Sequence, residues 1–317
     1  MKLFISSCNF KENENVDGSS LVYRIPCIQF EKNGWKIACI KELPILTFGN
    51  IERMYGCRPS VILIWMCGTY VNNNKPFLWR IRKYKHDVKM YWYIDDIHNN
   101  TKTRANLFNY FDLILNSYAY CFNLFYKPHI KTYWFPHYVN ENLLKELKYN
   151  ETPIQKIFLS GQVTENIYPA RHKALLIAKD NKNIQCIGHP GYNDRNKHKY
   201  CGSKYYSLIN TYLAAFTCCA KKDRPYIVAK FFEIISSGSL LIAYDEHVKQ
   251  QLKQLGFVER INYISCTIEN MQDVFDYVLD PCNREEINTI RRNGFELSKK
   301  NAHLCNRVKN FCEYIEA

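Results

Sequence analysis

The sequence predicts an α/β protein made of two doubly wound domains with parallel sheets. Short β-rich runs alternate with longer segments of helical pattern along the whole chain, as expected for sheets flanked by helices. Continuous apolar runs such as Val61–Met66 suit strands that are buried on both faces. The length of 317 residues allows two domains, each with its own core.

The first half of the chain contains six expected strands, separated by stretches long enough for helical crossovers such as Ser19–Glu31 and Arg104–Tyr110. The strands are expected at Leu3–Ser6, Lys36–Ile40, Val61–Met66, Lys89–Ile94, Leu113–Leu115 and Lys131–Phe135. A polar hinge over 141–155 follows, in which Pro153 ends any helix that precedes it.

A second alternating series follows the hinge. Its strands are expected at Lys156–Leu159, Ile184–Ile187, Ser239–Ala243 and Asn262–Ser265. Its helices are expected at Pro169–Lys179, Tyr205–Thr217, Ala229–Ser237, His247–Leu255 and Met271–Leu279, before two closing amphipathic helices. The predicted domains are therefore 1–145 and 146–300, followed by a terminal helix over 301–317.

The charge balance predicts an anionic partner. The chain carries 43 Lys and Arg against 30 Asp and Glu, a net charge of +13, and its 47 % apolar content excludes a disordered basic tail. A nucleic acid, an acidic membrane surface and a phosphorylated small molecule all fit this charge, as does a merely solvated basic surface. Because the cations are dispersed rather than gathered in one stripe, nucleic acid is not expected as a partner.

The cysteines and apolar runs predict a soluble, cytoplasmic protein in a reducing compartment. None of the 14 cysteines forms a Cys-x-x-Cys pair, and several, such as Cys67 and Cys218, lie inside apolar runs where a free thiol packs as a small hydrophobe. The N-terminus lacks the pattern of a signal peptide. The longest apolar run, Val61–Cys67, is far shorter than the roughly 20 residues that span a bilayer.

The segment AKFFEIISSGS carries the most chemical information. Lys230 and Glu233 are three residues apart on one helix face, and Gly238 ends that helix before an apolar strand. At the open end of a doubly wound sheet, a carboxylate can accept hydrogen bonds from ribose hydroxyls while a lysine neutralises phosphate. The alternative is an exposed salt bridge without a function.

This segment resembles the K/R-x-F-E-I-x-x-x-G signature of nucleotide-sugar glycosyltransferases of the retaining group 1 branch. Further segments match in order and spacing: YWYIDDIHNN, YFDLILNS, YWFPHYV, SGQVTENIYPARHKALL, IGHPGY and a terminal region with Arg291, Gly294, His303 and Arg307. The resemblance covers most of residues 89–310. It implies the GT-B fold: two Rossmann-like domains that face each other across a cleft, with a C-terminal helix that crosses back to the first domain.

The resemblance also implies a donor site in the second domain. Gly161 lets the backbone approach the diphosphate, Arg171 and Lys230 neutralise it, and Glu233 binds the ribose; His189 and Gly238 complete the expected set. Enzymes of this kind stabilise the leaving diphosphate with a loop, a helix N-terminus and basic side chains. No metal and no cofactor other than the donor itself are therefore expected.

The acceptor side is expected to follow the strand Lys89–Ile94. The resemblance places a polar residue, often His, at this point, and assigns the catalytic contacts with the transferred sugar to Asp95, Asp96 and His98. A helix N-cap cluster is the alternative, because Asn99, Asn100 and Thr101 come next.

One position departs from the family pattern. Retaining members carry a second Glu eight residues before the position of Glu233, where this chain has Pro225. The expected function is metal-independent transfer of a sugar from a nucleotide-diphosphate donor to a hydroxyl of a glycan, protein or lipid-linked acceptor. The alternatives are an inactive relative that binds a glycan or polyanion, and a base-glucosylating enzyme.

Peripheral contact with a membrane is compatible with the hypothesis of a glycosyltransferase. The aromatic and basic cluster Phe77–Lys85 could make such a contact. The alternative for this cluster is a partly buried helix whose cations reach the solvent.

Overall fold

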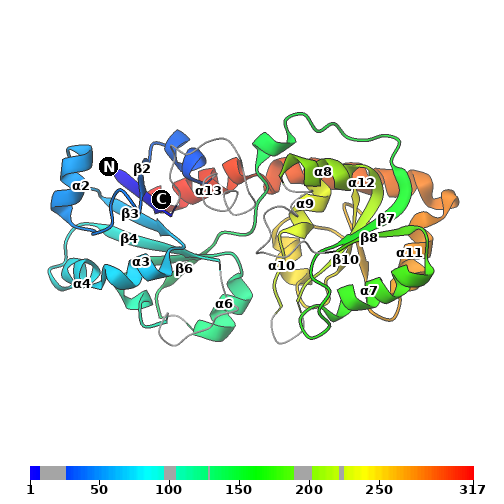
Figure 1. Cartoon of the computed structure of the whole chain (residues 1–317), viewed down its shortest axis with the longest axis horizontal. Helices are drawn as coiled ribbons and strands as arrows, with labels where there is room; N and C mark the ends of the chain where they lie inside the picture. Colours follow the sequence, from blue (N-terminus) through cyan, green and yellow to red (C-terminus); the bar gives the residue numbers. More distant parts are fainter. Residues whose placement is uncertain (8–25, 96–104, 128, 189–201, 221–224) are drawn as a thin grey trace. The chain divides into compact units, whose positions relative to one another are not determined.

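The computed structural model describes residues 1–7, 26–95, 105–127, 129–188, 202–220 and 225–317. The chain divides into two compact units (Figure 1). Unit 1 contains Met1–Pro136 together with Val308–Ala317, and unit 2 contains His137–Arg307. Each unit is built around one sheet flanked by helices, so the predicted α/β class with two doubly wound domains is confirmed.

Unit 1 contains a parallel sheet with the strand order β2-β1-β3-β4-β5-β6. Its strands are β1 (Lys2–Ser6), β2 (Lys36–Cys39), β3 (Val61–Trp65), β4 (Lys89–Ile94), β5 (Leu113–Asn116) and β6 (Lys131–Trp134). All six expected strands of the first half are present, because continuous apolar runs bounded by polar turns leave few alternatives.

The two faces of this sheet bury different side chains. Strand residues such as Ile5, Ile64 and Trp92 share one core with α2, α3 and α4. The helical elements of unit 1 are residues 26–32, α2 (Phe48–Tyr55), α3 (Gly68–Asn73), α4 (Lys75–Lys83), η1 (Phe108–Tyr110) and α6 (Ala119–Tyr126). The expected crossover at 19–31 is seen from residue 26, and its first part lies outside the described residues.

The opposite face is aromatic. Phe4, Trp65 and Tyr93 alternate with the residues of the first core, and Trp65 stacks on Tyr93 with ring centroids 3.7 Å apart. Phe311 from the C-terminal helix α13 (Leu304–Glu316) covers this face. Its ring lies 5.3–6.4 Å from five aromatic rings, those of Phe30, Trp35, Tyr91, Tyr133 and Phe135. The prediction that the terminal helix returns to the first domain is confirmed.

Unit 2 repeats the same topology. Its strands are β7 (Ile154–Ser160), β8 (Ile184–Ile187), β9 (Tyr212–Cys218), β10 (Leu240–Tyr244) and β11 (Ile264–Cys266), all parallel, in the order β11-β10-β9-β7-β8. In both units the first strand lies between the second and the third. The chain therefore adds strands first on one side of β1 and then on the other, and it does the same around β7 in the second sheet.

The central strand β9 was not predicted. The expected helix over Tyr205–Thr217 is wrong: it is the helix α8 (Ser203–Asn210) followed, after Thr211, by β9. Apolar runs of this length fit a buried strand and a buried helix equally well, so their periodicity cannot separate the two. Pairing with both β7 and β10 selects the strand.

Helices cover both faces of the second sheet (Figure 1). Helices α8, α9 and α12 pack together near β9 and β10, while α7 packs on β8 and α11 on β7. The remaining elements of unit 2 are η2 (Glu141–Leu144), α7 (Pro169–Asp180), α9 (Lys230–Ser236), α10 (Lys249–Gln254), α11 (Met271–Leu279), η4 (Pro281–Asn283) and α12 (Arg284–Asn301).

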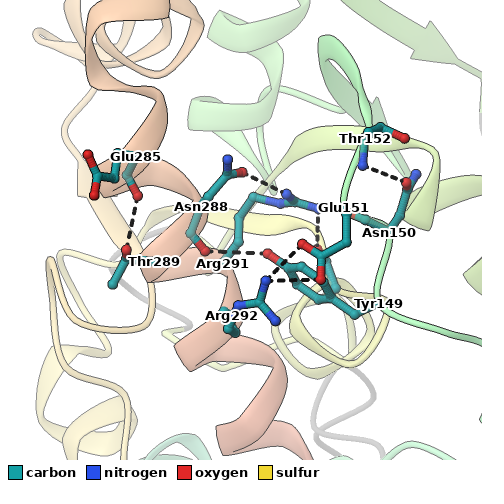
Figure 2. A network of polar contacts seen from close by, with 10 residues as sticks. Tyr149, Asn150, Glu151, Thr152, Glu285, Asn288, Thr289, Arg291 and Arg292 are labelled. Carbon is teal, nitrogen blue, oxygen red and sulfur yellow. Dashed lines mark hydrogen bonds and ion pairs between the residues drawn. The ribbon is translucent and has the colours of Figure 1, made fainter.

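A polar network anchors α12 to the segment that leads into β7 (Figure 2). The fully buried Arg291 donates hydrogen bonds to the carbonyls of Asn150 and Gly238, at 3.0 and 2.9 Å. Its guanidinium lies 4.9 Å from the ring centre of Tyr149. The adjacent Arg292 pairs with Glu151 on the surface, so two consecutive arginines hold one short segment.

The two units divide after Pro136, whereas the sequence analysis placed the boundary at 145. The intervening residues pack with unit 2 because Val139 bridges to His303 and exchanges backbone hydrogen bonds with Ala302 and Leu304. Within the described part of the chain, no helix is both long and apolar enough to cross a membrane. Cys218, expected as a buried free thiol, is buried and free, as is the adjacent Cys219, whereas Cys67 is free but only half-buried.

Replacing Phe311 with Ala should lower the free energy of unfolding of unit 1 by about 3–5 kcal/mol, since it removes a buried ring that five others contact. Urea unfolding followed by near-UV circular dichroism measures the change. Lys309→Ala, an exposed position on the same helix, should change the free energy by less than about 0.5 kcal/mol. Equal losses in the two variants would contradict the assigned packing.

Candidate functional site

The polar side chains of unit 2 converge where the sheet reverses its winding. The neighbouring strands β7 and β9 end at Ser160 and Cys218, and helices leave this edge on opposite faces of the sheet. In open α/β sheets the crevice at such a switch point is the usual place for a ligand. The residues found there are Gly161, Arg171, Tyr205, Lys230 and Glu233, together with Ser160 and Thr217.

Gly161 is required by space and by backbone conformation. Its φ of +100° lies in a region that side chains disfavour. A Cβ atom at this position would lie 2.8 Å from Cε of Lys230 and 3.3 Å from Nη1 of Arg171. The backbone after β7 therefore passes directly beside two cationic side chains.

Arg171 lies in the first turn of α7, which Pro169 begins. Its side chain is only 3 % exposed and donates to the carbonyl of Gln162 at 2.8 Å and to Oγ1 of Thr217 at 3.2 Å. Its guanidinium also lies 4.4 Å from the ring centre of Tyr168. Both acceptors are neutral, so these hydrogen bonds hold the side chain in place without cancelling its charge.

Lys230, the first residue of α9, is held by a chain of hydroxyl groups. Its Nζ donates to the Tyr205 hydroxyl at 2.7 Å, and that hydroxyl lies 2.8 Å from Oγ of Ser160. Burial works against the charged form of Lys230, but Tyr205 and Glu233 outweigh it and raise its pKa above the ordinary lysine value. Lys230 therefore stays a cation throughout the physiological pH range.

Glu233 lies one helical turn after Lys230 on the same face. Its Oε2 is 3.8 Å from Nζ of Lys230, and both side chains are 21 % exposed. Because 3.8 Å is longer than a hydrogen bond, the ion pair leaves the carboxylate able to accept hydrogen bonds from ligand hydroxyls. The site thus combines an acceptor group with two fixed cations.

The structure brings together four of the predicted donor-site residues: Gly161, Arg171, Lys230 and Glu233. The sequence analysis missed Tyr205 and Thr217. Both lie in the segment predicted as one helix, and the hydroxyl-rich stretch Ser203–Ser207 was the available signal for Tyr205.

Gly238 is not brought to this site, because it lies at the far end of α9 from Lys230. Its φ is +77°, a Cβ atom there would lie 3.2 Å from the Tyr149 ring, and its carbonyl accepts a hydrogen bond from Arg291. These contacts give Gly238 a role in packing α12 against the sheet.

On unit 1, Asp95 directly follows β4, as predicted. The predicted site residues Asp96 and His98, and His189 in unit 2, lie outside the described residues. The adjacent strand β3 is followed directly by Met66 and Cys67, with φ values of 61° and 39°. Two consecutive left-handed residues without a glycine are costly and are found preferentially at functional sites. The acceptor-side roles of Asp95, Asp96 and His98 stay predictions.

The described residues contain no group of three or more His, Cys, Asp or Glu side chains that could hold a metal ion.

Comparison with protein-family models gives no match, and comparison with curated protein sequences gives none. Solved structures do match over the whole chain. Sucrose-phosphate synthase from Thermosynechococcus elongatus aligns with a TM-score of 0.61 and 9 % identity, covering 100 % of this chain and 98 % of that one. A glycosyltransferase from Rickettsia africae aligns at 0.60 and 10 %, covering 98 % and 96 %.

Anabaena HepE in complex with UDP and glucose aligns with a TM-score of 0.59 and 10 % identity, covering 100 % of this chain and 99 % of that one. At such low identity these likenesses establish the fold. The chain has the GT-B fold of nucleotide-sugar glycosyltransferases, and the resemblance seen in the sequence is confirmed at that level.

Replacing Gly161 with Ala should destabilise unit 2 by about 1–3 kcal/mol, because the new methyl group combines positive-φ strain with a clash against Lys230. Gly188→Ala is the matched control in the same unit, since its Cβ would meet nothing within 4 Å. Urea unfolding of both variants measures the difference. Identical midpoints would show that Gly161 is not under this constraint.

Proposed function

We propose that the protein transfers a sugar from a nucleoside-diphosphate donor to an acceptor hydroxyl. The observation that carries the proposal is the convergence of Arg171, Lys230 and Glu233 around the bare backbone of Gly161 at the switch point of a doubly wound sheet. The fold shared with glycosyltransferases, one of them solved with UDP and glucose, supports it.

The chemistry follows from the charges. The bond between the anomeric carbon and the diphosphate oxygen breaks, and its electron pair leaves with the diphosphate, whose negative charge grows. Two prearranged cations stabilise this charge more strongly in the transition state than in the bound donor, which lowers the barrier. Arg171 and Lys230 take this role, and Glu233 accepts hydrogen bonds from the ribose hydroxyls.

The acceptor oxygen forms the new bond to the anomeric carbon and loses its proton. Asp95, Asp96 and His98 are our candidates for receiving that proton or contacting the sugar. We propose that no resident metal or cofactor takes part, since the two cations supply the charge that a metal would otherwise bring. The proposed acceptor is a glycan, a protein or a lipid-linked hydroxyl.

An inactive relative that binds a glycan or polyanion is the second candidate, and Pro225 in place of the expected Glu favours it. Incubating the purified protein with radiolabelled UDP-, GDP-, CMP- and dTDP-sugars distinguishes the two. Transfer or hydrolysis of any of them supports the enzyme. Tight binding without turnover supports the binding protein.

Glu233→Gln and Lys230→Met should each weaken the binding of the preferred nucleotide sugar about 10- to 100-fold, since each removes charge-assisted hydrogen bonds worth about 1.5–3 kcal/mol. Titration calorimetry measures the affinity. Arg171→Ala is less suitable, because the buried guanidinium also holds the Gln162 loop.

Glu296→Gln is the matched control for Glu233→Gln. Glu296 and Lys299 also form an i,i+3 pair, on α12 and in the opposite order along the chain, and both side chains are about half exposed. Its affinity should equal that of the unmodified protein. Unchanged affinity of the Glu233 and Lys230 variants for every nucleotide sugar would refute the assigned donor site.

Tyr205→Phe should weaken donor binding about three- to tenfold, because it removes the hydroxyl that fixes Lys230 while leaving the ring beneath it. In a Lys230→Met background the same change should have no further effect, since the tyrosine acts through the lysine. Calorimetry on the four proteins of this cycle gives the coupling. Additive losses would assign Tyr205 an independent role.

A further inference from the structure

Unit 1 exposes a group of large apolar side chains around α4. Ile45, Trp79 and Tyr84 are 64 %, 46 % and 61 % exposed. The opposite side of the same helix, with Phe77, Leu78 and Ile81, is buried in the core of unit 1. The helix is therefore fixed in the fold while it presents aromatic rings to the solvent. We call Ile45, Trp79, Lys83, Tyr84 and His86 the α4 surface.

The aromatic rings of this surface are contiguous. The ring centroids of Trp79 and Tyr84 lie 6.5 Å apart, those of Tyr84 and His86 6.3 Å, and those of His86 and Phe48 5.2 Å. A groove of about 640 Å³ opens between α4 and the segment Ile45–Phe48. Ile45, Phe48 and Phe77 give it apolar walls, and Arg80 and His86 also line it.

Positive charge surrounds these rings. The segment Lys75–Lys85 contains five cations and no acidic residue: Lys75, Arg80, Arg82, Lys83 and Lys85. Arg82 is paired with Asp112 at 2.8 Å. Lys83 lies over both exposed rings, at 4.4 Å from the Trp79 centroid and 5.4 Å from that of Tyr84. The exposed rings thus have a cation directly above them and others beside them.

We infer that the α4 surface docks on an anionic lipid membrane. Trp and Tyr have rings that favour the level of the lipid head groups. Lys and Arg stretch along apolar surface while their charged ends reach anionic head groups. A surface that combines both is complementary to such a bilayer in polarity and in charge, since the five cations of the segment Lys75–Lys85 outnumber the exposed Asp87 that follows it. The groove beside it has an apolar lining for part of a lipid.

This inference does not depend on the proposed sugar transfer. It concerns a different unit from the donor site, and its test measures association with a bilayer rather than turnover. Failure of one proposal leaves the other intact.

The test is co-sedimentation of the full chain with vesicles. We expect binding to vesicles of phosphatidylcholine with about one third phosphatidylglycerol, and weak binding to phosphatidylcholine alone. Raising the ionic strength should weaken the binding, because salt screens charges at a membrane surface. A protein that binds anionic polysaccharide but neither kind of vesicle would overturn the inference.

Tryptophan fluorescence gives a second, position-specific readout. All five tryptophans lie among the described residues: Trp79 is exposed, Trp134 is half-buried, and Trp35, Trp65 and Trp92 are buried. Docking should therefore shift the emission to the blue through Trp79. Trp79→Phe should remove the shift while largely preserving sedimentation. A shift that persists in Trp79→Phe would place the contact elsewhere and overturn the inference.

Variants distinguish binding through the α4 surface from binding through the general positive charge of the protein. Combining Trp79→Ala with Tyr84→Ala should lower vesicle affinity about tenfold or more through lost apolar burial. Lys83→Ala should lower it about fivefold, the effect of about 1 kcal/mol for a cation near the bilayer. Tyr120→Ala and Lys253→Ala remove an exposed tyrosine and an exposed lysine elsewhere and should leave it unchanged. Equal losses in these controls would overturn the assignment.

Discussion

The arrangement of the donor site depends on one constraint: two cationic side chains occupy the space beside the first residue after β7. Gly161 is the consequence, since any side chain there would meet Lys230 within 2.8 Å. Arg171 then spans from the Gln162 carbonyl to Thr217, which links the loop after β7 to the end of β9. Tyr205 and Ser160 complete the arrangement from α8 and β7. The hydrogen bonds of Arg171 and Lys230 go to neutral groups, and Glu233 is the one carboxylate close to Lys230, so the site retains a net positive charge.

Much of this architecture could be predicted from the sequence, for a physical reason. Parallel strands covered on both faces need unbroken apolar runs, and the short runs VILIW and LLIAY have this pattern. Helix geometry alone likewise predicts that Lys230 and Glu233, three residues apart, lie on the same helix face. Gly161 and Arg171 were identified through the family resemblance of the segment SGQVTENIYPARHKALL, and they lie just after a strand end and in the first turn of a helix.

The central strand β9 escaped prediction because its information is not local. YLAAFTC has neither alternation nor a breaker before it, and Thr211 alone separates it from α8. What selects a strand is the pairing with β7 and β10, which come from distant parts of the chain. Tyr205 was missed as a site residue for the same reason, because it lies in the segment that was predicted as one helix. The expected place of Gly238 in the donor site has a different outcome. Its position at the end of the helix was predicted correctly, but that end lies away from Lys230 and contacts Arg291 and Tyr149.

The path of α13 has a consequence for how the molecule forms. Unit 2 is one continuous stretch of chain, whereas unit 1 is completed by Val308–Ala317, whose Phe311 closes the aromatic face beside Phe30 and Trp35. During synthesis, unit 2 can therefore collapse while unit 1 still exposes a sheet face of unburied rings. The contacts that complete the first unit therefore join residues near the two ends of the sequence, and they are the last that the growing chain can form.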